Sequence, residues 1–213
     1  MKIVSHFLFI LSLIIIVVIQ HYDAKIAIEL IMTDGSKVYK YYPESTEYIS
    51  LSALYESGYR IKSVQGLEKL KNLKTLSYGP KLHDIENCDF LKPLTTLENL
   101  YLPYARIDDF SILSEMKNLK ELNFQGYITK EGIEKIKKNG LDFTFCPKLE
   151  KLTLDPLSEK FYFIPDIKIS SKKTELFMSE QNIKTVSKEE EAVLTRFIRV
   201  RLPKNVIRRM EKD

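Results

Sequence analysis

Few residues of this chain are of types that could do chemistry, and they lie far apart. Three histidines occur, and because His6 and His21 flank a hydrophobic leader, only His83 falls in the rest of the chain. A single histidine with no second ligand at metal spacing is typical of a solvated side chain. The run 189–191 of three glutamates is interpreted as a solvated helix start. With no glycine-rich phosphate loop and no nucleophile paired to a base, the sequence predicts no enzyme, no cofactor and no metal site.

The two cysteines are predicted to be buried and free. Cys88 aligns with Val64 and Phe110 in a repeated hydrophobic pattern, and Cys146 occupies another apolar position of the same pattern. They are about two repeats apart, roughly 10 Å at a rise of about 4.8 Å per repeat, whereas a disulfide needs Cα atoms within about 7 Å. Two thiols that pack as small apolar side chains are therefore expected.

Composition sets broad limits on the kind of protein. The chain has 213 residues, is 44% hydrophobic and 29% charged, and carries a formal net charge of +4. These values fit one folded domain with a small appendage. Because nucleic-acid binding usually needs a concentrated basic face, the mild charge excess predicts no nucleic-acid partner.

A hydrophobic template recurs in three successive segments, which span residues 61–78, 85–102 and 107–124. In each segment an apolar residue stands at every third position, and the last two apolar residues are two apart. Intervals of three suit a helical or 3₁₀ arc, and the closing pair suits a short strand. A helical bundle is the rival interpretation, but it would need partners at i+4 and i+7. Each coil leaves one apolar side uncovered, so the coils must stack on their neighbours.

The segments LEKLKNLKTLSY, LKPLTTLENLYL and LSEMKNLKELNF resemble bacterial leucine-rich repeats of the 22-residue, internalin-like type. The resemblance implies an α/β repeat fold, a leucine-rich-repeat solenoid over residues 48–186. Its parallel β-strands would form the concave face and its helical or 3₁₀ arcs the convex face. The expected first strand residues of the successive repeats are Leu54, Leu76, Leu100, Leu122, Leu152 and Leu176.

Two features depart from a regular repeat. The asparagine that the family places five residues after each marker is replaced by Tyr59, Lys81, Ala105 and Tyr127, so these turns must satisfy their backbone groups in another way. An insertion over residues 129–139 predicts a longer helix, which Gly140 ends.

Both ends of the solenoid are expected to carry caps. Residues 25–47 are assigned to an N-terminal β-hairpin cap, with strands over 26–32 and 37–42 joined by an Asp-Gly turn. Residues 187–213 are assigned to a C-terminal helical cap and basic tail. A capping box at 187–190 starts that helix, which would carry Val193, Phe197 and Val200 on one side and end near Pro203. A further strand is expected on either side of Pro165 within residues 161–169.

Residues 1–24 form a leader that indicates export. Residues 7–19 are apolar apart from Ser12, which suits a secretory signal and is short for a membrane span. Its best cleavage site, after Ala24, has the bulky Tyr22 at the −3 position. The leader is therefore either a cleaved signal peptide or a retained N-terminal membrane anchor, and the protein is expected to be extracytoplasmic: at the cell surface, in the periplasm or membrane-anchored. The membrane segment would include Phe7, Leu11, Ile15 and Ile19.

The surface with most scope for binding is the concave sheet. Small polar residues mixed with aromatic ones suit recognition of another protein. The residues proposed to contact that partner are Tyr55, Ser77, Asn99, Tyr101, Asn123, Thr153 and Phe177. A plain solvated sheet is the alternative, in which case the protein would be a non-catalytic structural component of the cell envelope. The basic tail from Arg196 either contacts an anionic membrane or an acidic partner, or packs on the last repeat.

Overall fold

The computed structural model describes residues 25–51, 61–79, 88–157, 164–178, 187–197 and 199–201. The expected membrane segment (Phe7, Leu11, Ile15 and Ile19), His83 and the tail after Arg201 lie outside the described residues, as do Leu54 and Tyr55. Within the described part of the chain, no helix has the length and hydrophobicity of a membrane span.

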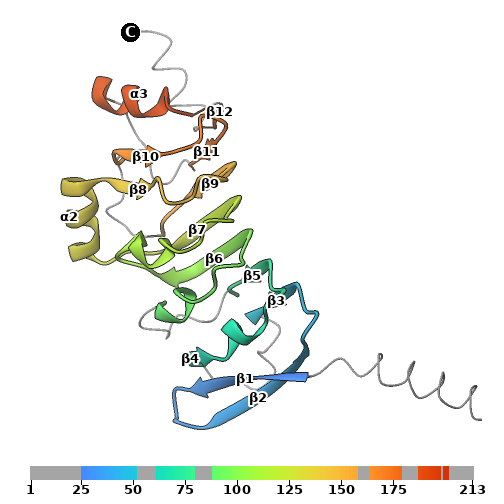
Figure 1. The fold of residues 1–213 in the computed structure, drawn as a ribbon. Helices are drawn as coiled ribbons and strands as arrows, with labels where there is room; N and C mark the ends of the chain where they lie inside the picture. The colour runs from blue at the N-terminus through green and yellow to red at the C-terminus, as the bar shows by residue number, and fades with distance from the viewer. Residues whose placement is uncertain are drawn as a thin grey trace, which may run out of the picture.

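One parallel sheet of seven strands organises the molecule (Figure 1). Its strand order is β12-β11-β9-β7-β6-β5-β3, and every neighbouring pair is parallel. The strands are β3 (Tyr48–Ser50), β5 (Thr75–Ser77), β6 (Asn99–Arg106), β7 (Glu121–Tyr127), β9 (Lys151–Leu154), β11 (Glu175–Phe177) and β12 (Arg199–Arg201). Within this sheet the order along the chain and the order in space coincide, as expected when successive coils stack.

The strand register follows the hydrophobic template. Leu76 pairs with Leu100, Leu100 with Leu122, Leu122 with Leu152 and Leu152 with Leu176. All five leucines are 0% exposed. Because side chains alternate between the two faces of a strand, this register directs the neighbouring polar residues to the opposite face.

The register differs from the prediction at the first repeat. The residue opposite Leu76 is Ile49 of β3, so the expected marker at Leu54 was wrong by five positions. The reason lies between these strands, where β4 (Ile61–Gln65) forms a strand instead of the expected helical arc. β4 pairs antiparallel with β1, and the pairing has a bulge at Lys62, which lets Ile61 and Val64 both be buried although they are three residues apart.

Short helices lie on the other side of the stack, in segments between successive strands of the sheet. The predicted 3₁₀ arcs are present as η2 (Leu67–Lys69), η3 (Asp89–Leu91) and η4 (Phe110–Leu113). The predicted insertion is α2 (Lys130–Asn139), whose first turn is capped by the Thr129 hydroxyl accepting from the Gly132 N–H. A two-stranded parallel sheet, β8 (Leu141–Phe143) with β10 (Ile167–Ile169), lies on this side too (Figure 1).

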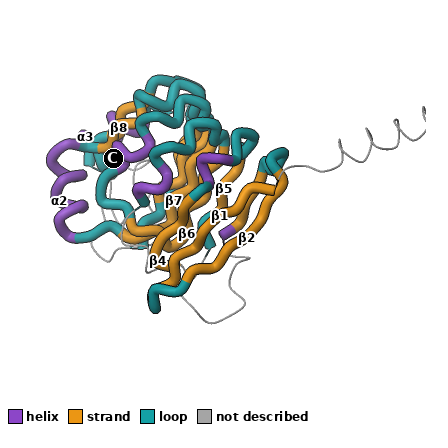
Figure 2. The backbone as a smooth tube through the Cα atoms, turned by 60° about the horizontal axis from the view of Figure 1, so that its bottom comes forward, coloured by secondary structure: helices purple, strands orange, loops and turns teal. Residues whose placement is uncertain are grey.

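The predicted hairpin is present as β1 (Lys25–Met32) and β2 (Lys37–Pro43), which pair antiparallel. Asp34 Oδ1 accepts from the Ser36 N–H at 2.9 Å, and Gly35 takes the positive φ (84°) that the turn requires. Together with β4 the hairpin forms a three-stranded sheet that is the outermost layer at one end of the stack (Figures 1 and 2).

The C-terminal end differs in part from the prediction. The capping box is confirmed: Ser187 N donates to Glu190 Oε2 at 2.7 Å, and Glu190 N donates to Ser187 Oγ at 3.2 Å. The helix α3 (Lys188–Leu194) is shorter than predicted, and Val200 lies not on it but in β12, opposite Leu176. The backbone of β11 would otherwise present an open edge, and pairing with residues 199–201 satisfies those groups.

Side chains tie each coil to the one before it, on the turn that enters each strand. Asn72 Nδ2 donates to Glu44 O (3.2 Å), Thr96 Oγ1 to Leu73 O (2.7 Å), Asn118 Nδ2 to Thr95 O (3.4 Å) and Thr174 Oγ1 to Leu149 O (2.6 Å). The asparagines that the family places after each strand are missing here. These bonds satisfy backbone carbonyl groups between neighbouring coils instead, at positions before the strand.

A single hydrophobic core runs through the stack from Ile28 to Phe197. Cys88 and Cys146 are both buried within it and free, as predicted. A parallel sheet, arcs on its back and a continuous core are together compatible with a leucine-rich-repeat solenoid.

Candidate functional site

The face of the seven-stranded sheet that points away from the core carries one aligned row of side chains. We call it the central row; it contains one residue from each of six strands: Ser50, Ser77, Tyr101, Asn123, Thr153 and Phe177. Each member is half-buried. Because neighbouring strands are about 4.8 Å apart, Tyr101 and Phe177 stand roughly 14 Å apart with Asn123 and Thr153 between them.

A second row lies two residues earlier on each strand. This flanking row consists of Tyr48, Thr75, Asn99, Glu121, Lys151 and Glu175. Asn99 Nδ2 donates to Thr75 Oγ1 at 3.1 Å, and Lys151 Nζ lies 2.5 Å from Glu121 Oε1. Opposite charges on adjacent strands are thus paired within the face.

The two rows are joined by a network that crosses four strands. The Tyr101 hydroxyl donates to Glu121 Oε2 at 3.0 Å, Glu121 binds Lys151, and the Lys151 ammonium lies 5.5 Å from the centre of the Phe177 ring. Partial burial, and then the hydrogen bond to Glu121, raise the pKa of Tyr101. Its ring is therefore held in place as a neutral phenol at physiological pH, and both aromatic residues of the row, Tyr101 and Phe177, are positioned before any partner arrives.

Asn123, at the middle of the row, has the one unsatisfied buried polar atom among the described side chains. Its Oδ1 is shielded from solvent and accepts no hydrogen bond. An unpaired buried acceptor costs about 1–3 kcal/mol.

Charged residues also line the edge where the chain enters the strands. Lys74 Nζ lies 2.6 Å from Glu47 Oε1, and Lys120 Nζ lies 2.7 Å from Glu98 Oε2. The hydrogen bond from Lys120 lowers the pKa of Glu98, and the bond to Glu47 raises the pKa of Lys74. Since these charges pair with one another, this edge offers little net charge to a ligand.

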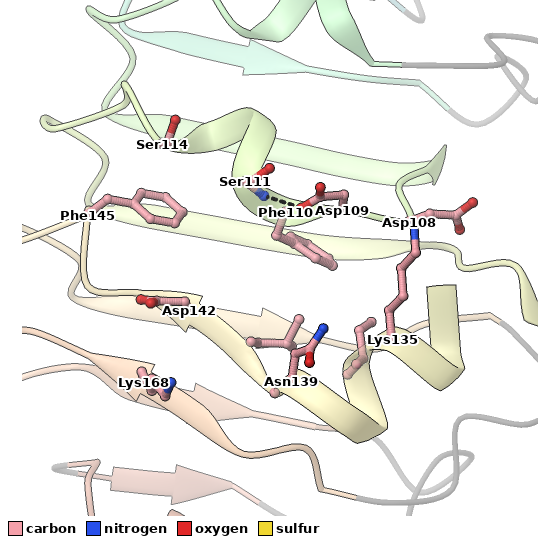
Figure 3. Close-up of a pocket in the computed structure, with 13 residues that line it drawn as sticks. Asp108, Asp109, Phe110, Ser111, Ser114, Lys135, Asn139, Asp142, Phe145 and Lys168 are labelled. Carbon is pink, nitrogen blue, oxygen red and sulfur yellow. Dashed lines mark hydrogen bonds between the residues drawn. The ribbon is translucent and has the colours of Figure 1, made fainter. Parts of the chain in front are cut away.

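A cleft of about 370 Å³ lies on the opposite side of the molecule, between η4, α2 and β8 (Figure 3). Its acidic side chains have local structural partners: Asp109 accepts from Ser111 N at 2.8 Å, Asp142 from Thr144 N at 2.8 Å, and Asp108 from Thr129 N at 2.6 Å. No group of three His, Cys, Asp or Glu side chains that could hold a metal occurs in the described ranges. The carboxylates of the cleft therefore already stabilise two turns and the start of α2.

The two thiols are as inaccessible as the sequence predicted. Burial raises the pKa of Cys88 and the pKa of Cys146 to about 12 each. Each thiol is near a backbone carbonyl, Arg106 O at 3.5 Å and Met116 O at 3.6 Å. Protonated, buried and hydrogen-bonded thiols are poor nucleophiles.

The sequence-predicted contact residues fall into three groups. Ser77, Tyr101, Asn123, Thr153 and Phe177 share the central row, and Asn99 belongs to the flanking row of the same face. Tyr55 is outside the described residues; the place assigned to it, opposite Ser77, is held by Ser50, because the first strand begins at Tyr48.

Sequence reasoning overlooked the Glu121–Lys151 pair, which links Tyr101 to Phe177. The available signal was the opposite charge of these residues at the same template position in adjacent repeats. The opposite charges predict an ion pair only when the two strands are known to be neighbours, since Glu121 and Lys151 are 30 residues apart in the chain.

Comparisons with known proteins gave likenesses among solved structures. No family model and no curated protein matches the chain. Among solved structures, it is similar to an internalin (inlF) from Listeria monocytogenes str. 4b F2365, with 18% identity and a TM-score of 0.43. The match covers 76% of this chain and 50% of that chain, so the chain spans about half the length of the internalin structure. Similarity at this level identifies no partner, ligand or activity.

Proposed function

We propose that this protein is an exported leucine-rich-repeat solenoid, kept at the membrane by its N-terminal segment, that binds another protein through the outer face of its seven-stranded sheet. In this proposal the hairpin and the C-terminal helix with β12 are the two caps of the stack. Binding, and not catalysis, is the role that a rigid face of aligned side chains fits best.

The observation that carries the proposal is the central row. Tyr101 and Phe177 supply aromatic contact area, Asn123 and Thr153 supply hydrogen-bonding groups between them, and all are half-buried. Aromatic anchors around a polar centre are the usual composition of a protein-binding surface. Glu121 and Lys151 neutralise each other beside the row, so the fitting partner presents a neutral, polar and aromatic surface.

The leader sequence supports export and membrane attachment. Its apolar run over residues 7–19 follows Lys2, and the bulky Tyr22 stands where a signal peptidase requires a small residue. Intact mass measurement of the chain extracted from the membrane fraction tests attachment. A chain that begins at Met1 supports a retained anchor, whereas a chain that begins at Lys25 in the soluble extracytoplasmic fraction refutes it.

Binding is tested by cross-linking in intact cells, identification of the captured protein and titration of the purified pair. Tyr101→Ala removes the anchor and leaves Glu121 without its phenol donor, so binding should weaken by about 1–2 kcal/mol, a rise in the dissociation constant of roughly 5- to 30-fold. In the titration of the purified pair, where no membrane is present, Tyr41→Ala is the matched control, because Tyr41 is an exposed tyrosine (64%) of the hairpin and not of the sheet face. Equal affinities for both variants would move the site away from the central row.

The alternative, a structural component of the cell envelope with no partner on this face, makes a different prediction. The set of proteins captured by cross-linking would then not change when the central row is altered. It would change only when the N-terminal segment or the basic tail is altered. Salt is a second discriminator. Because the charges of the face are internally paired, the affinity at the central row should change little between low and physiological ionic strength.

A further inference from the structure

The β1–β2 hairpin has two unlike faces. Its inner face, which includes Ile28 and Leu30, is buried in the core at 0% and 1% exposure. Its outer face carries Tyr39 and Tyr41, whose side chains are 47% and 64% exposed. The hairpin is the last layer of the stack, and no described element packs on its outer face (Figures 1 and 2).

Exposed apolar and aromatic area is concentrated on β2. Of the six large hydrophobic side chains that are exposed in the described ranges, three belong to this strand: Val38, Tyr39 and Tyr41. Lys25 and Lys37 share the face of Tyr39 and Tyr41, whereas Val38 and Lys40 pair with Leu30 and Ile28 and belong to the inner side of the hairpin. The single acidic group of these strands, Glu29, is neutralised by Lys37 at 2.7 Å and accepts from the Tyr39 hydroxyl at 3.1 Å.

This composition matches the headgroup layer of a membrane. Tyrosine is enriched there because its ring is apolar and its hydroxyl is wet, and lysine attracts anionic headgroups. Two exposed tyrosines on one face, with the only carboxylate of that face already paired, suit an interface better than water alone.

The chain length before the hairpin places this face near the apolar leader. The apolar run ends at Ile19, and only residues 20–24 separate it from Lys25, a stretch that spans at most about 17 Å. Lys25 lies opposite Pro43, and Ala27 opposite Tyr41, so Tyr41 is near the end of the hairpin where the chain enters, and Tyr39 is two residues further from that end. A headgroup layer is roughly 5–8 Å thick on each side of a bilayer, which is well within that reach.

We propose that the outer face of the hairpin, formed by Tyr39, Tyr41, Lys25 and Lys37, rests on the headgroup layer of the membrane that holds the N-terminal segment. The inference depends on the retained anchor of the proposed function and adds the orientation of the molecule. With the hairpin on the bilayer, the stack of coils stands away from the membrane, and the central row faces sideways, open to a partner.

The chain contains no tryptophan, which allows a depth measurement with a single fluorophore. Full-length Tyr41→Trp protein is reconstituted in vesicles of phosphatidylcholine and phosphatidylglycerol in which part of the lipid is brominated near the headgroup end of its acyl chains. The matched control is Leu157→Trp: Leu157 is 37% exposed and follows β9, four strands along the sheet from β3. Circular dichroism checks that both variants are folded.

The expected result is that brominated lipid quenches the emission of the Tyr41→Trp variant at least about twofold more than that of the Leu157→Trp control, because only an interfacial ring reaches the bromine atoms. Equal quenching of both variants, or none of either while the protein stays in the vesicles, overturns the docking and leaves the anchor standing. Protein that does not stay with the vesicles overturns the anchor as well. Unquenched emission from the Tyr41→Trp variant, together with cross-linking between hairpins of two copies, would overturn the docking and assign this face to self-association.

Discussion

The contact between β6 and β7 beyond the central row gives the sharpest test of the stacked structure. Gly126 lies on the buried side of β7, and a Cβ atom added there would be 2.0 Å from Ala105 O and 2.6 Å from Phe124 Cε2. Ordinary contact begins at 3.4 Å, so the Ala105 carbonyl would have to move by about 1.4 Å. The obstacle is the backbone of a paired strand and cannot rotate away as a side chain could.

Gly126→Ala should therefore cost about 3 kcal/mol, the upper part of the range for overpacking. In urea unfolding followed by circular dichroism, a loss of this size lowers the midpoint by roughly 1–1.5 M if the slope is unchanged. Because β6 and β7 also carry Tyr101 and Asn123, the same variant should weaken partner binding.

Gly35→Ala is the matched control for this glycine. Gly35 has a positive φ of 84° but no heavy atom within 4 Å of an added Cβ. Its substitution should cost only about 1 kcal/mol, from the left-handed backbone conformation. If Gly126→Ala proves as stable as the unaltered protein, or less damaging than Gly35→Ala, the close approach of β6 to β7 is wrong.

Three further changes test the interior and the helix start. Thr174 is buried, and its hydroxyl donates to Leu149 O of the preceding coil at 2.6 Å. Thr174→Val should therefore lower the free energy of unfolding, measured in urea, by about 1–3 kcal/mol. An unchanged free energy of unfolding would refute a stabilising role for this hydrogen bond. Thr129→Ala removes the cap of α2 and should cost about 1–2 kcal/mol, with Thr144→Ala as an exposed-turn control; equal costs would contradict a special role for the cap. The thiols Cys88 and Cys146 should resist alkylation until the protein unfolds. Each thiol has a pKa of about 12 in the folded protein and an ordinary pKa of 9.0, so its contribution to the free energy of unfolding is complete below pH 9 and is lost as the pH rises towards 12. Cys88→Ala should therefore reduce the loss of stability between pH 9 and pH 12. An unchanged pH profile of stability would refute this.

Much of the strand arrangement could be predicted from the sequence because it depends on local periodicity. A closing pair of apolar residues two apart is a strand wherever it occurs, and coils of similar length bring equivalent residues such as Leu100 and Leu122 side by side. The helix at α2, the capping box of α3 and the turn of the hairpin likewise depend on residues within a few positions of one another.

The candidate site could be predicted only in part. Alternation identified the face to which Tyr101, Asn123 and Phe177 belong, since polar residues beside inward leucines must point outward. The start of the first strand could not be predicted, because pairing between β4 and β1 competes with the helical arc and shifts the first coil. Periodicity in one segment contains no information about a partner strand in a distant part of the chain.

The C-terminal end illustrates the same limit. The spacing of Val193, Phe197 and Val200 fits a helix, and the first two are buried as such a helix would require. Only the position of the free edge of β11 explains why the chain leaves the helix after Leu194 and returns as a strand. Unpaired backbone groups at a sheet edge outweigh a weak local preference.

By itself, then, the sequence determined which residues are inside, which face of each strand is outside, and that the coils must stack, because alternation and burial of leucine are local consequences of side-chain chemistry. The tertiary structure alone decided which outward residues meet. It brought Glu121 beside Lys151 and between Tyr101 and Phe177, and it left the tyrosines of β2 uncovered at the end of the stack. Contacts between distant parts of a chain depend on the register of whole strands, and the register is set by the packing of all coils together.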